Sequence, residues 1–270
     1  MRRLSLDHIT AVDTTPIQLA KAARAAGCDG LCLFMEPMEV LPLMPPFDIY
    51  GDRAQRRAFG QVLADLGVTL DLGYPFTLAG RTDVAAFAPA MECAAELGAG
   101  LLNALVYDRD PARREDKFAQ FCDLARDHGL GVAVEFYPVS QVRSLAEGLE
   151  LVGQLGWPGE VGVNVDLLHL MRSGGSIAEL AAAPPEYVLY AQVCDGPATM
   201  DADKLDFEAS SDRLLPGDGV FDVAGFVAAL PPTCPVSVEV PRNALVGPDC
   251  PPEQRACEAV QATRRVLGEV

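Results

Sequence analysis

Residues 131–169 read GVAVEFYPVSQVRSLAEGLELVGQLGWPGEVGVNVDLLH, and this stretch shows the unit that recurs along the chain. Two short runs rich in valine, 132–136 and 161–165, lie on either side of a segment, 140–155, whose apolar residues have helical spacing. A strand, a helix and a second strand in this order are typical of parallel sheets, because the helix carries the chain back to the start of the next strand. The stretch therefore predicts a parallel α/β fold.

Strand-like runs alternate with helical segments over the whole sequence. The expected strands are Leu4–Ile9, Gly30–Met35, Val68–Leu72, Leu101–Val106, Val132–Phe136, Val161–Val165, Val188–Val193 and Val236–Val240. The expected helices are Thr15–Ala26, Arg53–Leu66, Asp83–Leu97, Pro111–His128, Ser140–Leu155, Ile177–Ala182, Val223–Leu230 and Pro252–Leu267. Eight strand–helix units predict a (β/α)8 TIM barrel, with residues 1–270 forming a single domain. A doubly wound open sheet is the alternative, but no glycine-rich dinucleotide fingerprint follows the first strand.

Composition narrows the classes of partner. The 270 residues are half hydrophobic, and the net charge of −17 argues against nucleic acid and against an anionic membrane surface, both of which need a basic face. A small molecule is the better expectation. The eight cysteines form no CxxC pair, and the first ten residues lack the apolar core of a signal peptide. These features favour reduced thiols and a cytoplasmic protein.

Four expected strands in the second half carry an oxygen donor at or just after their carboxyl ends: Glu135, Asp166, Gln192 and Glu239. Parallel barrel strands end at one rim, so these four side chains are expected to meet there and bind one divalent metal ion. An all-oxygen set favours Mg²⁺ or Mn²⁺, with Co²⁺ and Zn²⁺ as alternatives; zinc usually takes histidine or thiolate ligands, and the chain has three histidines. The alternative is that each of the four is a separate salt-bridge or helix-cap residue.

Further candidates for substrate contact follow other strands or lie in the long loops. His169, three residues after Asp166, is expected to act as an acid or base or to bind a substrate hydroxyl, although a lone histidine is more often structural. Two long connections, 36–51 and 195–222, are expected to form a lid or a substrate wall. The remaining candidates for substrate contact are His8, Tyr74, Tyr107, Asp195, Arg213 and Arg242. The alternative for Asp195 is turn formation, and the alternative for each of the two arginines is a surface ion pair.

The stretches VAVEFYP, NVDLLHLMRSGG, YAQVCDGP, RLLPGDG and SVEVP resemble, in their order and spacing, the xylose isomerase-like TIM barrels. This superfamily includes sugar phosphate isomerases and epimerases. The resemblance implies a metal held by Glu135, Asp166, Gln192 and Glu239, a catalytic or substrate-binding His169, and a homodimer or tetramer. Sugar epimerases of the superfamily usually have histidine where this chain has Gln192, whereas 3-dehydroshikimate dehydratases can place glutamine there. Its apurinic endonucleases are excluded by the acidic charge and the few histidines.

The expected function is that of a metal-dependent isomerase or epimerase that removes a proton next to the carbonyl of a keto-sugar or sugar phosphate. Glu135 and Glu239 would flank the reacting carbon, one as base and one as acid. Loss of a β-hydroxyl, with His169 as acid or base, would instead give a dehydratase of the 3-dehydroshikimate type. A non-catalytic barrel that binds a metal or ligand is the second alternative.

Overall fold

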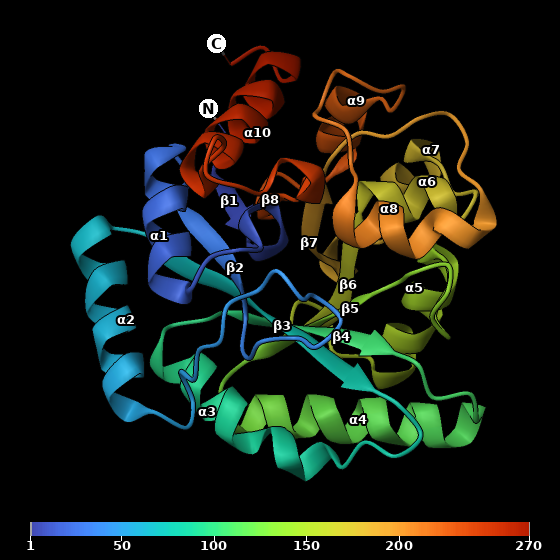
Figure 1. Cartoon of the computed structure of the whole chain (residues 1–270). Coiled ribbons are helices and arrows are strands. Elements are labelled where there is room, and N and C mark those ends of the chain that lie inside the picture. Colours follow the sequence, from blue (N-terminus) through green and yellow to red (C-terminus); the bar gives the residue numbers. More distant parts are fainter. Residues whose placement is uncertain (1, 270) are drawn as a thin grey trace.

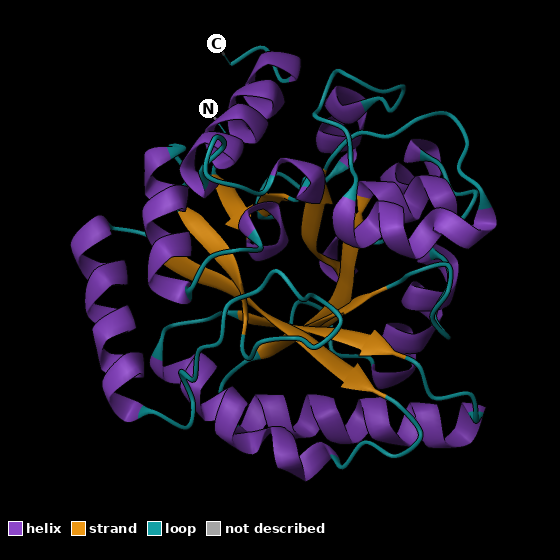
Figure 2. Cartoon of the chain, in the orientation of Figure 1, coloured by secondary structure: helices purple, strands orange, loops and turns teal. Residues whose placement is uncertain are grey.

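The computed structural model describes residues 2–269 and shows a closed barrel of parallel strands. Each strand pairs with the next along the chain, and the first pairs with the last, so the sheet has no free edge. Helices form a ring outside the strands, and the first and last described residues, Arg2 and Glu269, are hydrogen-bonded to each other (Figures 1 and 2). The predicted (β/α)8 barrel is confirmed, and the open sheet is excluded.

The strands are β1 (Leu4–Asp7), β2 (Gly30–Phe34), β3 (Thr69–Leu78), β4 (Leu101–Val106), β5 (Gly131–Glu135), β6 (Val161–Asp166), β7 (Val188–Val193) and β8 (Val236–Val238). Seven of the strands begin and end within two residues of the predicted positions, whereas β3 continues six residues beyond its predicted end, to Leu78. The helices are α1 (Pro16–Ala25), α2 (Arg53–Leu66), α3 (Ala88–Glu96), α4 (Pro111–Asp127), α5 (Leu145–Leu155), α6 (Leu167–Arg172), α7 (Ile177–Ala182), α8 (Leu205–Ser211), α9 (Val223–Ala229) and α10 (Pro252–Val266). None of them combines the length and apolar character needed to cross a membrane.

Alternation along the strands creates two separate apolar regions. In β2, Leu31 and Leu33 belong to the large core between strands and helices, whereas Cys32 and Phe34 belong to a smaller cluster inside the barrel. Successive side chains of a strand point to opposite faces, so each strand supplies both regions. The outward positions are almost all apolar. The inward positions near the carboxyl ends are the polar residues that the next section describes.

Local capping explains where one helix departs from the prediction. The segment predicted as Ser140–Leu155 becomes helical only at Leu145, because Ser144 is the N-cap and accepts a hydrogen bond from the N–H of Glu147. Ser140 instead closes a turn through hydrogen bonds with Val142. The helix ends at Gly156, whose φ of 67° is the left-handed conformation that glycine adopts at helix ends.

Two long connections lie at the carboxyl ends of the strands, as predicted. The connection between β2 and α2 crosses in front of β3 and β4 in Figure 1. The connection between β7 and α9 contains α8, a short helix that the sequence did not predict. The expected helix near Ile177–Ala182 is α7, but a further helix, α6, begins directly at the end of β6. These segments surround the mouth of the barrel.

Candidate active site

Four buried carboxylates lie inside the barrel near its mouth, and we call them the acidic cluster: Asp7, Glu135, Asp166 and Glu239. Each occupies an inward position at or just after the carboxyl end of its strand, since the residue before it packs into the outer core. No carboxylate of the cluster is more than 5% exposed. Ionised carboxylates are strongly destabilised by such burial unless cations or hydrogen-bond donors accompany them.

The guanidinium of Arg213 bridges two members of the cluster. Its Nη1 donates to Asp166 Oδ2 at 2.7 Å and to Glu239 Oε2 at 3.0 Å. Its Nε donates to the carbonyl of Ala209, so the side chain is also tied to the end of α8. Among residues 2–269, no other arginine or lysine pairs with the cluster. One guanidinium therefore faces four buried carboxylates.

This imbalance shifts the pKa values of the carboxyl groups in opposite directions. Burial raises the pKa of Glu239 well above its usual range, and Asp7 and Asp166 nearby raise it further against the attraction of Arg213. Burial also acts to raise the pKa of Asp166, but the charge of Arg213 and the neighbouring His169 bring it down to about 2. The pKa of Asp7 rises to about 6 through burial, although hydrogen bonds to its carboxylate oppose the rise. Strongly perturbed groups in one cavity are typical of functional sites.

His169 lies beside two members of the cluster. Its Nε2 is 3.4 Å from Glu135 Oε1 and 3.5 Å from Asp166 Oδ2. These positions follow from the sequence, since Asp166 caps α6 through the N–H of Leu168 and His169 then falls one turn into that helix. The ring of His169 also packs against that of Tyr137, with the centroids 4.4 Å apart.

Gln192 takes part in a chain of amide hydrogen bonds across the barrel. Its Oε1 accepts from Asn164 Nδ2 at 2.5 Å, and its Nε2 donates to Asp7 Oδ2 at 3.1 Å. Asn164 also donates to Asn103 Oδ1, and Asn103 donates to Glu135 Oε2. Both ends of the Gln192 carboxamide are therefore engaged within this chain, next to the acidic cluster. Its predicted place as a fourth metal ligand stays a prediction.

Two members of the acidic cluster, Glu135 and Glu239, line a pocket of about 480 Å³. Glu135, His169, Arg213 and Glu239 form its polar side. Tyr74 and Tyr107, which were predicted to contact substrate, also line it. Tyr74 donates its hydroxyl to Asp7, and burial raises the pKa of Tyr107 to about 12, so this phenol stays neutral.

The other predicted contact residues lie away from this pocket. His8 is fully buried in the turn after β1, where its Nε2 bonds to the carbonyl of Thr14. Arg242 pairs with Glu258 at 2.8 Å, which is the surface ion pair considered as its alternative. Asp195 accepts hydrogen bonds from four backbone N–H groups and thereby holds the loop after β7; the donors are Gly196, Gly217, Gly219 and Phe221.

His8 departs from the prediction because β1 is shorter than expected. The strand stops at Asp7, whose Oδ1 accepts from the N–H of Ile9 and starts a 3-10 turn. Since a change of one residue moves a side chain to the other side, Asp7 points into the barrel and His8 does not. Asp7 is thus a site residue that the sequence interpretation missed, although an aspartate after the alternating run LSL was a usable signal.

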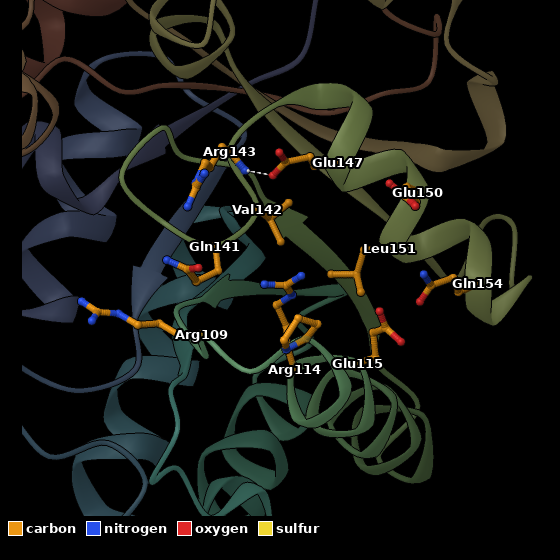
Figure 3. A pocket seen from close by; sticks show the side chains of 11 residues that line it. Arg109, Arg114, Glu115, Gln141, Val142, Arg143, Glu147, Glu150, Leu151 and Gln154 are labelled. Atoms are coloured by element: carbon orange, nitrogen blue, oxygen red, sulfur yellow. Dashed lines mark hydrogen bonds between the residues drawn. The ribbon is translucent and has the colours of Figure 1, made fainter.

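A second hollow of about 420 Å³ lies outside the barrel mouth, between the start of α4 and α5 (Figure 3). Basic and acidic side chains both line it, and the N–H of Arg143 donates to Glu147 Oε2 at 2.7 Å. Its three arginines are Arg109, Arg114 and Arg143, and its three glutamates are Glu115, Glu147 and Glu150. Charges of both signs balance here, so the hollow lacks the concentrated charge of the barrel site.

The donors at the barrel mouth fit a divalent metal ion. Ligand atoms of Glu135, Asp166 and His169 all lie within 4.8 Å of one another, and all three residues are buried. Two carboxylate oxygens and an imidazole nitrogen suit Mn²⁺, Co²⁺ or Zn²⁺ better than they suit Mg²⁺. The excess of buried negative charge is a second reason to expect a cation. The structure therefore brings three donors together, with His169 among them.

The family model of xylose isomerase-like TIM barrels matches residues 20–266. The chain belongs to this family. No protein in the set of curated sequences matches it. The likeness to the solved structures described below, at 14–22% sequence identity, shows the shared fold.

Three solved structures illustrate that likeness over nearly the whole chain. The IolI protein with a bound zinc atom has a TM-score of 0.77 at 18% identity, covering 99% of this chain and 98% of that one. D-psicose 3-epimerase with D-fructose has a TM-score of 0.75 at 14% identity, covering 98% and 99%. AsbF from Bacillus anthracis, a probable 3-DHS dehydratase, has a TM-score of 0.73 at 16% identity, covering 98% of each chain.

A longer protein shares the same barrel. The chain matches a xylose isomerase-like TIM barrel/4-hydroxyphenylpyruvate dioxygenase fusion protein with a TM-score of 0.78 at 22% identity. The match covers 99% of this chain but spans only 44% of the fusion protein.

Proposed function

We propose that the protein is a metal-dependent enzyme that removes a proton next to the carbonyl of a keto-sugar or related hydroxyketone, as an isomerase or epimerase. The observation that carries the proposal is the acidic cluster, in which one buried guanidinium stands against four carboxylates, two of which, Glu135 and Glu239, line a pocket. Structural neighbours that include an epimerase and a zinc-binding barrel support it.

Glu135 and Glu239 are the groups proposed to move the proton. Both line the pocket, on strands β5 and after β8, so they reach it from different sides of the barrel. Burial raises the pKa of Glu239, so its ionised carboxylate is a stronger base than a solvated glutamate. The hydrogen bond from Asn103 fixes one oxygen of Glu135 and leaves the other toward His169.

Glu135, Asp166 and His169 would hold the metal ion. When bound, a divalent cation polarises a substrate carbonyl and stabilises the negative charge that develops as the proton leaves. Arg213 keeps Asp166 ionised, and the apolar walls of the pocket exclude water from the reacting carbon.

A dehydratase is the second candidate. His169 lies 3.4 Å from Glu135, and in this reaction it would protonate a departing β-hydroxyl instead of serving as a metal ligand. The neighbouring AsbF structure is of a probable dehydratase, which keeps this outcome open for the same first step. We also propose a small-molecule substrate and a homodimer or tetramer.

Exchange of a substrate α-proton with D₂O tests the shared first step. We expect exchange with the metal-loaded protein, and a loss of at least about a hundredfold in Glu239→Gln, because the amide cannot accept the proton. Glu258→Gln is the control, since Glu258 pairs with Arg242 away from the pocket. Unchanged exchange in Glu239→Gln would remove Glu239 from the base role. A protein that retains no divalent ion and gains no thermal stability from added Mn²⁺ or Zn²⁺ would contradict the metal site.

A further inference from the structure

We propose that the substrate is uncharged and presents an apolar end to one wall of the pocket. This inference rests on the proposed function and names its substrate class. It narrows the expected substrates by removing sugar phosphates and carboxylate-bearing ketones such as dehydroshikimate. Two independent observations carry it, the charges that line the pocket and the side chains that form its outer wall.

The charges around the pocket oppose an anion. Arg213 is the only arginine or lysine among the residues that line it, and its guanidinium already bonds to Asp166 and Glu239. The other charged lining residues include Asp206, which accepts from the hydroxyl of Tyr137, and Glu135. A phosphate or carboxylate entering here would meet negative charge without a free cationic partner.

A metal ion would not reverse this balance. A divalent cation adds two positive charges to a cluster of four carboxylates and one guanidinium. The cation would therefore offset the charges of the acidic cluster, and none would be left over to attract an anionic group farther up the pocket. Proteins that recognise phosphate usually supply arginine, lysine or a helix N-terminus for it.

Much of the remaining pocket lining is apolar. Phe34 and Tyr74 pack with their ring centroids 4.3 Å apart, and Leu41 of the β2–α2 connection belongs to the same apolar cluster inside the barrel. Nearer the opening, Val40 is 78% exposed and Phe207 of α8 is 59% exposed. These two exposed side chains come from the two long connections and line the same pocket. Apolar side chains exposed at a pocket mouth are typical of ligand contact surfaces.

The pocket also offers a donor suited to a neutral oxygen. Tyr107 lines it, and its hydroxyl makes no hydrogen bond to any of residues 2–269. The phenol is neutral because burial raises its pKa to about 12, so it can donate to a hydroxyl or carbonyl oxygen. The site thus combines a polar reaction end with an apolar far end.

A matched set of ligands that differ at one carbon tests the inference. D-fructose, D-fructose 6-phosphate and 6-deoxy-D-fructose carry a hydroxyl, a phosphate and only hydrogen at carbon 6. Titration calorimetry with the metal-loaded protein should show the phosphate binding at least about tenfold more weakly than the free sugar, and the deoxy sugar about tenfold more tightly. Equal or tighter binding of the phosphate would overturn the proposal, and so would a set in which neither neutral sugar binds at millimolar concentration.

Charged variants at the mouth provide a second readout. Phe207→Lys should improve phosphate binding relative to the free sugar by about tenfold, because it adds a cation to the apolar wall. Val220→Lys is the control, since Val220 is 65% exposed but does not line the pocket. Equal effects of both variants would show that the wall does not contact the ligand. If the sugars bind but their α-proton does not exchange with D₂O, only the proposed reaction is contradicted, because binding is measured separately.

Discussion

Replacing Arg213 by methionine removes the one guanidinium that pairs with the acidic cluster, while keeping a side chain of similar length. Asp166 and Glu239 then remain buried without their cation. Removal of one partner from a buried ion pair costs about 3–5 kcal/mol. The raised pKa of Glu239 allows that group to take up a proton and soften the loss. We therefore expect about 3 kcal/mol less stability at neutral pH in the absence of metal.

Added metal should affect this variant more than any other. With Arg213 absent, a cation bound by Glu135 and Asp166 no longer meets a positive charge that already contacts Asp166. We expect this variant to bind Mn²⁺ about tenfold more tightly than the wild type does. Saturating Mn²⁺ should therefore stabilise the variant by about 1.4 kcal/mol more than it stabilises the wild type. Urea unfolding at pH 7, with chelator and then with Mn²⁺, measures both quantities.

A matched variant separates this effect from the loss of any buried ion pair. Arg172 bonds through Nε and Nη2 to Glu208, and both side chains are buried away from the pocket. Arg172→Met should lose similar stability but gain nothing extra from metal. Two outcomes would refute the reasoning. One is a loss below about 1 kcal/mol in Arg213→Met without metal, and the other is an equal response of both variants to Mn²⁺.

Two further outcomes are expected elsewhere in the barrel. Burial lowers the pKa of His8 from 6.5 to about 4, so the unfolded chain takes up a proton first as the pH falls. The contribution of neutral His8 to stability is complete above pH 6.5 and falls by about 3 kcal/mol as the pH drops from 6.5 through 4. Urea unfolding across this range should therefore give stability-against-pH curves for wild type and His8→Gln that diverge in acid. Parallel curves would contradict the account. Asp195→Ala should lower the free energy of unfolding by about 2 kcal/mol, because a carboxylate that accepts hydrogen bonds from four backbone N–H groups is lost. Amide hydrogen exchange should accelerate at Gly217 and Gly219. Unchanged exchange there would show that the loop is held by other contacts.

The fold followed from the sequence because strand and helix periods were distinct in every unit. The elements that the sequence did not reveal are short. Helix α6 starts directly after β6, with Asp166 serving as both strand end and helix cap, so the period changes without a break. Helix α8 lies inside a connection, where seven residues give too few turns for a clear period.

The carboxylates of the site were largely predictable, and their partners were not. Glu135, Asp166 and Glu239 lie at the carboxyl ends of strands, so the parallel barrel alone brings them together. The bond from Arg213 depends on how a long loop folds back over the mouth, which local sequence does not determine. The hydrogen bonds of Gln192 depend on inward residues of neighbouring strands, Asn164 and Asp7, that no single segment contains.

The arrangement around Asp195 has a consequence for how new specificities could be introduced into this barrel. One carboxylate holds the start of the β7–α9 connection and also Phe221 near its end, so the loop closes on itself at its base. That same loop carries Phe207 and Arg213, which contribute to the pocket from outside the strands. The loop is therefore a self-contained segment that can be exchanged as a unit. Grafting a different loop between Asp195 and Phe221 would alter the pocket lining while leaving the strand-borne carboxylates in place, provided that the graft keeps Arg213 and the glycines that donate to Asp195.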